Sequence, residues 1–299
     1  MGCLVQRNID IDAEIWAALK IKATKMNKNV RELAGEILTK FVKTNKIGIP
    51  KKPKAIIIAA GPGKRLMPLT KAKPKCMLDF NGKTLLQRQI EVFRECGIED
   101  IIVIRGHKKN AINYSGLKYF YNVDYQTNNI LESMFCAESE MNGEFVVTYS
   151  DIWFDKSVLE KLLDSKKDIS LIVDQHWQSS YEERYQHPIE EAEKVVVKEG
   201  KIVKVGKGLN KNEAHGEFIG LAKFTESGAE ILKSIYRIAK NLYSDKPFHE
   251  ASVFKKAYLT DMIQELIDRG FDVHNVDIEG HWMEIDTHED YQKALKTIK

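Results

Sequence analysis

The sequence is poor in cysteine and has no long apolar run. Its four cysteines are Cys3, Cys76, Cys96 and Cys136, with no Cys-x-x-Cys and no short Cys/His spacing. This scatter argues against a disulfide framework and a structural zinc site. The longest apolar run, residues 55–60, is far shorter than the roughly 20 residues that cross a bilayer. The polar start, MGCLVQRNIDID, is unlike a signal peptide. We therefore expect a cytoplasmic protein without a membrane partner.

Charge is unevenly distributed along the 299 residues. Residues 1–54 contain 12 Lys+Arg against 5 Asp+Glu, whereas the remainder contains 34 against 38. The change coincides with KTNKIGIPKKPK, whose two prolines, glycine and five lysines are typical of a linker. We predict a small domain over residues 1–46, a linker over 47–53 and a large domain over 54–299.

The small domain has a strand-helix-helix pattern. Residues 5–11 alternate as a short strand does, Asp12 is a candidate N-cap, and apolar residues recur at helical spacing in AEIWAALKIKATKMN and again in VRELAGEILTKFV. A unit of about 40 residues is near the lower limit for folding alone. We therefore expect it to need a partner to close its core.

Residues 5–42 resemble the ribbon-helix-helix family, whose paired chains place a two-stranded ribbon in the DNA major groove. The resemblance implies a homodimer, and DNA contacts through Gln6, Arg7 and Asn8. The alternatives are a dimerisation arm and a helical cap on the large domain. Asp10, on the expected outer face of the strand, would repel phosphates. DNA binding is therefore possible but not favoured.

The large domain begins with a strand and a glycine turn. The apolar KAIIIAA, residues 54–60, predicts a strand buried on both faces, and GPGKRLMPLT follows it. Backbone amides beside two glycines can face an anion. The turn is not a Walker A loop and not a dinucleotide fingerprint, because Arg65 and Leu66 occupy the diagnostic positions. The candidate triphosphate-binding residues are Ala60, Gly61, Gly63, Lys64 and Arg65.

The segments that follow predict a βαβ unit. After Pro74 and Lys75 come the turn FNGKT, the amphipathic TLLQRQIEVFRECG and the apolar DIIVIRG. This arrangement resembles the nucleotidyltransferases that activate sugar phosphates and small phospho-alcohols. The resemblance implies an α/β fold with a Rossmann-like, mixed, mostly parallel sheet of the nucleotide-diphospho-sugar transferase type. It also implies that Lys75 contacts phosphate near the reacting centre.

Two carboxylates complete the expected chemistry. Asp151 ends the apolar segment GEFVVTYSD, and Asp286 lies in GHWMEIDTHEDY. The family resemblance matches both to metal-binding aspartates, which implies Mg²⁺ as cofactor. With Lys75 and Arg65 they form the predicted catalytic set. The alternatives are a turn role for Asp151 and a helix N-cap role for Asp286. We expect Glu284 to be a neighbour, not a ligand.

The segment YNVDYQTNNILESMFCA resembles the part of cytidylyltransferases that passes the nucleobase. Amides both donate and accept hydrogen bonds, so they suit a pyrimidine edge, although they equally suit turns. The candidates are Asn122, Asn128, Asn129 and Ser133. Gly106 is similar to the family glycine whose backbone approaches the base.

Residues 174–220 resemble the subgroup that acts on phosphocholine, phosphonates and inositol phosphate. The candidate acceptor-binding residues are Asp174, Arg184, His187, Lys207, Glu217 and Trp282. Arginine suits a bidentate phosphate contact, and Glu217 suits a hydroxyl or amine. An aromatic cage for a cationic head group is a further hypothesis, from Trp177, Tyr181, Tyr185 and Trp282. Solvated surface charges and core aromatics are the alternatives.

We predict a Mg²⁺-dependent cytidylyltransferase that joins CMP from CTP to a small phosphorylated or phosphonylated acceptor and releases pyrophosphate. One alternative is a sugar-1-phosphate nucleotidyltransferase that uses UTP, dTTP or GTP. The other is a DNA-binding regulator whose large domain senses a nucleotide.

Overall fold

The computed structural model describes residues 11–44, 52–182 and 184–298. The chain divides into two compact units, Met1–Lys51 and Lys52–Lys299. The strand expected over residues 5–11 lies outside the described residues except for Ile11. Within the described residues, no helix combines the length and the hydropathy of a membrane span.

The first unit contains two helices, α1 (Ala13–Lys25) and α2 (Val30–Thr44). Asp12 is the N-cap of α1, as predicted, and its carboxylate accepts a hydrogen bond from the backbone N–H of Glu14 at 2.8 Å. The helices bury Ala23 and Leu33. Most of the predicted apolar positions are instead exposed: Ile15, Trp16, Met26, Ile37, Leu38 and Phe41. The described part of this unit therefore has very little core.

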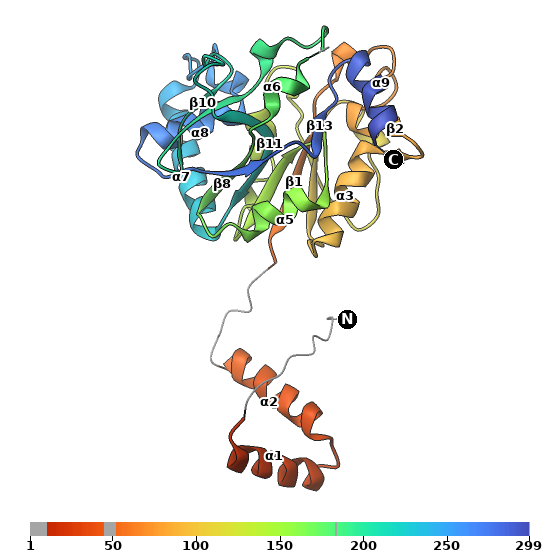
Figure 1. Ribbon diagram of the computed structural model, residues 1–299, viewed down its shortest axis with the longest axis vertical. Coiled ribbons are helices and arrows are strands. Elements are labelled where there is room, and N and C mark those ends of the chain that lie inside the picture. The colour runs from red at the N-terminus through yellow and green to blue at the C-terminus, as the bar shows by residue number, and fades with distance from the viewer. Residues whose placement is uncertain (1–10, 45–51, 183, 299) are drawn as a thin grey trace. The chain divides into compact units, whose positions relative to one another are not determined.

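The second unit is built on a nine-stranded sheet (Figure 1). Seven strands follow the order β10-β9-β11-β6-β1-β4-β5, β8 pairs with β11, and β12 pairs with β8. The strands of this sheet are β1 (Lys54–Ala59), β4 (Ile101–Arg105), β5 (Lys118–Tyr121), β6 (Phe145–Tyr149), β8 (Ile169–Asp174), β9 (Lys194–Lys198), β10 (Lys201–Gly206), β11 (Gly216–Phe224) and β12 (His274–Ile278). Two small ribbons pair β2 (Asp79–Phe80) with β3 (Lys83–Thr84) and β7 (Ile152–Phe154) with β13 (Trp282–Glu284).

The parallel part of the sheet lies at its centre. Strand β1 pairs in parallel with β4 and β6, and β4 pairs in parallel with β5. Residues 55–59 are all buried, because a central strand with both faces covered needs a continuous apolar sequence. Strand β11 joins the other side of β6 in the antiparallel direction. The predicted mixed α/β sheet is confirmed.

Helices cover both faces of this sheet (Figure 1). They are α3 (Leu85–Glu95), α4 (Ile130–Phe135), α5 (Lys156–Asp164), α6 (Trp177–Ser180), α7 (Glu226–Tyr243), α8 (Leu259–Asp268) and α9 (His288–Thr297). One core joins α3 and α5 to one face, and the other core joins α4, α7 and α8 to the opposite face. A third, smaller core packs α9 against the β2–β3 ribbon and Leu66. This last contact brings the C-terminal segment beside the glycine turn.

Candidate active site

A cavity of about 740 Å³ lies at the carboxyl ends of β1 and β6, the edge where parallel α/β sheets bind ligands. Most of the predicted site residues line it: Ala60, Gly61, Gly63, Lys64, Arg65, Lys75, Asn128, Ser133, Asp151, His187, Lys207, Glu217, Trp282 and Asp286. These residues come from segments far apart in the sequence. The fold therefore brings the expected nucleotide, metal and acceptor residues to one place.

The glycine turn depends on close backbone approaches. Gly63 has a φ of 56°, and its carbonyl accepts a hydrogen bond from the Thr70 hydroxyl at 2.8 Å. Gly106 follows β4 and packs directly on Ala60, since a Cβ at Gly106 would lie 2.5 Å from the Ala60 carbonyl oxygen. Gly106 therefore supports the turn from behind and does not line the cavity.

Lys75 connects the two aspartates. Its Nζ donates to Asp151 Oδ2 at 2.7 Å and also to Asp286 Oδ1. Arg65 pairs with the other oxygen of Asp286. Burial opposes the charged form of Lys75, but Asp151 and Asp286 outweigh it and raise its pKa. Burial likewise opposes the charged form of Asp286, but Lys75 and Arg65 hold its pKa well below its usual range.

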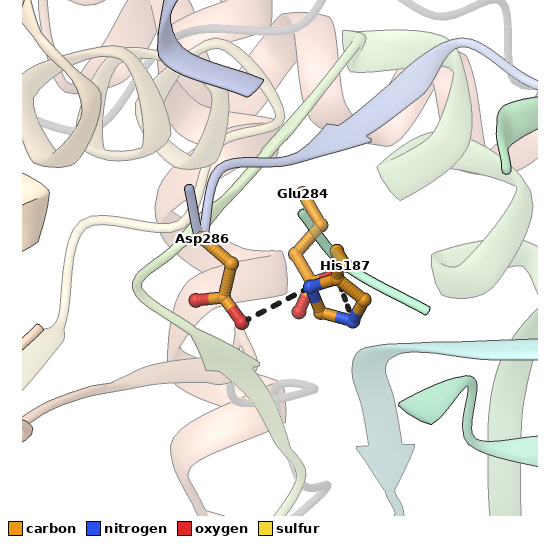
Figure 2. Close-up of side chains that lie close together, drawn as sticks. All are labelled: His187, Glu284 and Asp286. Carbon is orange, nitrogen blue, oxygen red and sulfur yellow. Dashed lines mark ion pairs between the residues drawn. The ribbon is translucent and has the colours of Figure 1, made fainter. Parts of the chain in front are cut away.

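His187, Glu284 and Asp286 form a compact group of possible metal ligands, with one donor atom of each within 4.8 Å of the others. Figure 2 shows the imidazole of His187 with a dashed contact to each of the two carboxylates. Its Nδ1 lies 3.6 Å from Asp286 Oδ2, and its Nε2 lies 3.7 Å from Glu284 Oε2. Burial, then the charge of Arg184, lowers the pKa of His187 to about 4. Burial, then Asp286, raises the pKa of Glu284.

The donor set suits a divalent cation. Asp151 Oδ1 and His187 Nδ1 are buried and have no hydrogen-bond partner among the described residues. Carboxylate oxygens are the ligands that Mg²⁺ prefers. Glu284, expected as a neighbour of the ligands, lies inside the candidate ligand group.

Arg184 holds this region together from outside the cavity. Its guanidinium donates to Asp290 Oδ1 at 2.7 Å and to Glu284 Oε2 at 3.0 Å. Asp290 also accepts from the backbone N–H of Asp286 at 3.0 Å and caps α9 together with Thr287. Thr287, not Asp286, is therefore the N-cap, and the cap fixes the backbone that carries Asp286. Arg184 was predicted to bind the acceptor, but it does not line the cavity, and its guanidinium donates to Asp290 and Glu284.

The amide residues form a small network at another part of the cavity wall. Asn122 Nδ2 donates to Asn128 Oδ1 and to Ser133 Oγ, each at 2.8 Å, and Asn128 Nδ2 donates to Asn122 Oδ1 at 3.0 Å. Asn122 is buried and does not line the cavity, whereas Asn128, Asn129 and Ser133 do. The network fixes which way the Asn128 amide points.

The structure corrects two predictions, the acceptor-binding role of Asp174 and the aromatic cage. Asp174 does not line the cavity; it accepts from Trp282 Nε1 at 2.7 Å and so positions that ring, which does line it. Trp177 is 2% exposed and belongs to the core, whereas Tyr185 is 86% exposed. Tyr181 packs on Trp177 and donates to Glu217 at 2.7 Å. These four aromatics therefore do not form a cage.

Sequence reasoning missed several lining residues: Cys76, Tyr125, Gln126, Tyr149, Ser150, Glu191, Glu193 and Tyr258. Tyr149 and Ser150 directly precede Asp151, so their position at a strand end was a usable signal. Glu193 precedes the apolar KVVVK, and an acidic residue at the edge of a buried strand is a weaker signal. Tyr258 has no local signal, because it reaches the cavity from the start of α8.

Comparison with known proteins identifies the family to which this fold and cavity belong. Residues 55–198 match the family described as MobA-like NTP transferase domain. The CTP:phosphoglutamine cytidylyltransferase of Campylobacter jejuni is 32% identical over 256 residues, which cover 81% of this chain and 99% of that protein. The chain belongs to this nucleotidyltransferase family, and the predicted resemblance is confirmed. Members of the family typically use a divalent metal.

Other similar proteins support the same fold. The choline-phosphate cytidylyltransferase of Streptococcus pneumoniae is 36% identical over 105 residues, 34% of this chain and 46% of that protein. A structure of the CTP:phosphocholine cytidylyltransferase of that organism has a TM-score of 0.63 at 24% identity and covers 83% of this chain and 100% of its own. The inositol-1-phosphate CTP transferase from T. maritima has a TM-score of 0.64 at 23% identity, with coverages of 82% and 96%.

Proposed function

We propose that this chain is a Mg²⁺-dependent cytidylyltransferase that transfers CMP from CTP to the phosphate or phosphonate of a small acceptor. The observation that supports this most is that the glycine turn, Lys75, Asp151 and Asp286 all line one cavity. The similarity to a cytidylyltransferase of Campylobacter jejuni over 99% of its length supports CTP as the nucleotide.

The reaction joins two anions. Backbone amides of the glycine turn, with Lys64 and Arg65, bind the β- and γ-phosphates. An acceptor oxygen attacks the α-phosphorus, the bond from that phosphorus to the bridging oxygen of the β-phosphate breaks, and pyrophosphate leaves with the electron pair. Lys75 stabilises the negative charge on the α-phosphate and the incoming acceptor, because its ammonium stays charged at the cavity wall.

Asp151 and Asp286 hold the metal in this proposal. A bound Mg²⁺ supplies positive charge that offsets the repulsion between nucleotide and acceptor. Asp151 contributes Oδ1, the buried oxygen without a hydrogen-bond partner among the described residues. Lys75 and Arg65 pair with Asp286 in this structure, and both line the cavity in which we place the triphosphate.

Asn128 and Ser133 read the nucleobase in this proposal. Asn122 orients the Asn128 amide through two hydrogen bonds. An amide held in one orientation distinguishes the donor and acceptor pattern of cytosine from that of uracil.

Pyrophosphate release tests the proposal. The full chain is assayed with Mg²⁺, each of the four ribonucleoside triphosphates, and phosphocholine, 2-aminoethylphosphonate, inositol phosphate and glucose-1-phosphate. Binding of each triphosphate without acceptor is measured by calorimetry. Selective binding of CTP, with turnover on a small head group, is the expected result. Selective binding of UTP, or turnover only with glucose-1-phosphate, would instead indicate a sugar-phosphate enzyme.

A further inference from the structure

Glu217 is a buried carboxylate that faces the cavity and lacks a full set of partners. It lies in β11, is 4% exposed and lines the cavity. Its Oε1 accepts from the Tyr181 hydroxyl at 2.7 Å. Its Oε2 has no hydrogen-bond partner among the residues that the structure describes. A buried carboxylate oxygen without a donor is costly unless a ligand supplies one.

Glu193 is a second buried carboxylate on the same wall. It is 8% exposed, lines the cavity and accepts from the Tyr149 hydroxyl at 3.2 Å. Its carbonyl accepts from the backbone N–H of Phe218 at 2.8 Å, which sets this residue beside the start of β11. Glu193 and Glu217 are therefore neighbours, although 24 positions separate them in the sequence.

The neighbouring cations are engaged elsewhere. Lys207 Nζ donates to Glu191 at 2.9 Å and lies 4.5 Å from the centre of the Tyr258 ring. Lys194 Nζ donates to two backbone carbonyls, at 3.0 and 3.1 Å. Arg184 binds Asp290 and Glu284. Among the hydrogen bonds of the described residues, these three cations donate none to Glu193 or Glu217.

Lys207 attracts Glu193 through space, but among the described residues neither carboxylate accepts a hydrogen bond from a cation, which leaves a place for positive charge. A ligand hydroxyl would satisfy one hydrogen bond but bring no charge. A protonated amine supplies both, and a quaternary ammonium supplies the charge. The rings of Tyr149, Tyr258 and Trp282 also line the cavity and suit a cation. Burial, as the largest cause, raises the pKa of Glu193 to about 8 and that of Glu217 to about 7, and a cation bound beside them would favour their charged forms.

We propose that Glu193 and Glu217 select acceptors that carry a cationic nitrogen in addition to their phosphate or phosphonate. The inference rests on the proposed function, since it concerns the acceptor of the same reaction. It narrows that acceptor from any small phosphorylated molecule to an amino or alkylammonium compound, and it disfavours uncharged polyol phosphates.

Matched pairs of ligands test the charge directly. The full chain is saturated with the α,β-methylene analogue of CTP, which does not react. Calorimetry then compares phosphoethanolamine with n-propyl phosphate, and phosphocholine with 3,3-dimethylbutyl phosphate. Each pair has nearly equal size and differs in one positive charge. We expect the cationic member to bind about tenfold tighter or better in at least one pair.

Two variants locate the effect. Glu217→Gln keeps an acceptor for Tyr181, and Glu193→Gln keeps one for Tyr149. Each substitution should reduce the preference for the cationic ligand to about threefold or less. Glu190→Gln removes the same charge from an exposed residue outside the cavity lining and should keep the preference. Melting curves confirm that each variant is folded.

The outcomes separate the two proposals. Equal affinity within both pairs, or no binding of any of the four ligands, overturns the acceptor inference. If the CTP analogue still binds in that case, the proposed function is not contradicted. A preference that survives in both variants also overturns it. Failure of the CTP analogue to bind overturns the proposed function, and the acceptor inference with it.

Discussion

The ammonium of Lys75 lies 2.7 Å from Asp151 Oδ2 and also pairs with Asp286, so one lysine joins the two carboxylates that follow β6 and β13. Without nucleotide, this lysine neutralises the groups that we propose for Mg²⁺. Metal and lysine therefore compete for the same oxygens until a triphosphate gives the ammonium another anionic partner.

Lys75→Met should strengthen metal binding to the nucleotide-free protein while it lowers turnover. Removing the buried cation leaves Asp151 and Asp286 less neutralised, so we expect the affinity for Mn²⁺ to rise about tenfold. Electron paramagnetic resonance of free Mn²⁺ measures the affinity. Lys71→Met, at an exposed position, is the control. Unchanged or weaker Mn²⁺ binding in Lys75→Met would argue against the competition.

Asp151→Asn should abolish turnover and leave much of the CTP affinity. The substitution removes a negatively charged oxygen from the proposed metal site, and we expect turnover to fall by about 100-fold or more. Asp155→Asn is the matched control, because Asp155 is an exposed carboxylate four residues further on. Steady-state pyrophosphate release and calorimetry with CTP measure the two effects. Activity that returns at saturating Mg²⁺ would rule out the assignment.

Local sequence was sufficient for the parts of the site that one segment builds. The glycine turn follows one buried strand and Asp151 follows another, so their place at the carboxyl edge of a parallel sheet could be predicted from the strand pattern alone. The N-cap at Asp12 could also be predicted from local sequence, because its hydrogen bond spans only two residues.

Contacts between residues far apart in the sequence could not be predicted from local sequence. The residues around Arg184 in the sequence suggested phosphate binding. In the structure its guanidinium instead donates a hydrogen bond to Asp290, which is 106 residues away. Trp177 and Tyr185 are both aromatic and lie close in sequence, but one is in the core and the other is exposed. Such outcomes depend on which segments the tertiary fold brings together, and no local pattern encodes that.

Arg184→Met should destabilise the second unit strongly. The substitution leaves the carboxylates of Glu284 and Asp290 without their shared cation, and breaking one side of a buried ion pair costs about 3–5 kcal/mol. Arg184→Lys keeps the charge but loses the fork, so it should cost less. Urea unfolding followed by circular dichroism measures both. Equal stability of wild type and Arg184→Met would show that the pair contributes no net stability.

The stability of the free protein should fall as the pH rises toward the pKa of Glu193. Burial raises this pKa to about 8, with Lys207 and Tyr149 opposing the shift and Glu217 adding to it. Between the ordinary carboxyl pKa and about 8, the folded state binds more protons than the unfolded state, so unfolding becomes easier with rising pH. Glu193→Gln removes this proton and should flatten the decline in Tm.

Melting temperatures at a series of pH values, from about 5 to about 8.5, measure this decline. Glu190→Gln, with the same loss of charge at an exposed position, should follow the wild type. Parallel curves for wild type and Glu193→Gln would contradict the assignment. Some slope should remain in Glu193→Gln, because burial also raises the pKa of Glu217 to about 7.

The N-terminal unit should make the full chain a dimer. Of the apolar residues that the structure describes in its two helices, only Ala23 and Leu33 are buried. Ile37 and Leu38 are 46% and 51% exposed. A second copy would cover such side chains. We expect Ile37→Glu to convert the sedimenting dimer to a monomer, and Thr39→Glu, which adds the same charge to the same helix, to leave it a dimer.

Sedimentation velocity of the three full-length proteins distinguishes the possible roles of this unit. A wild-type monomer would contradict dimerisation. DNA binding is the competing role, and it predicts affinity for a duplex that falls steeply as salt rises, because lysines and arginines would displace counterions from phosphates. Pyrophosphate release should be nearly equal in the dimeric and monomeric variants, since each residue that we assign to the reaction lies in the second unit.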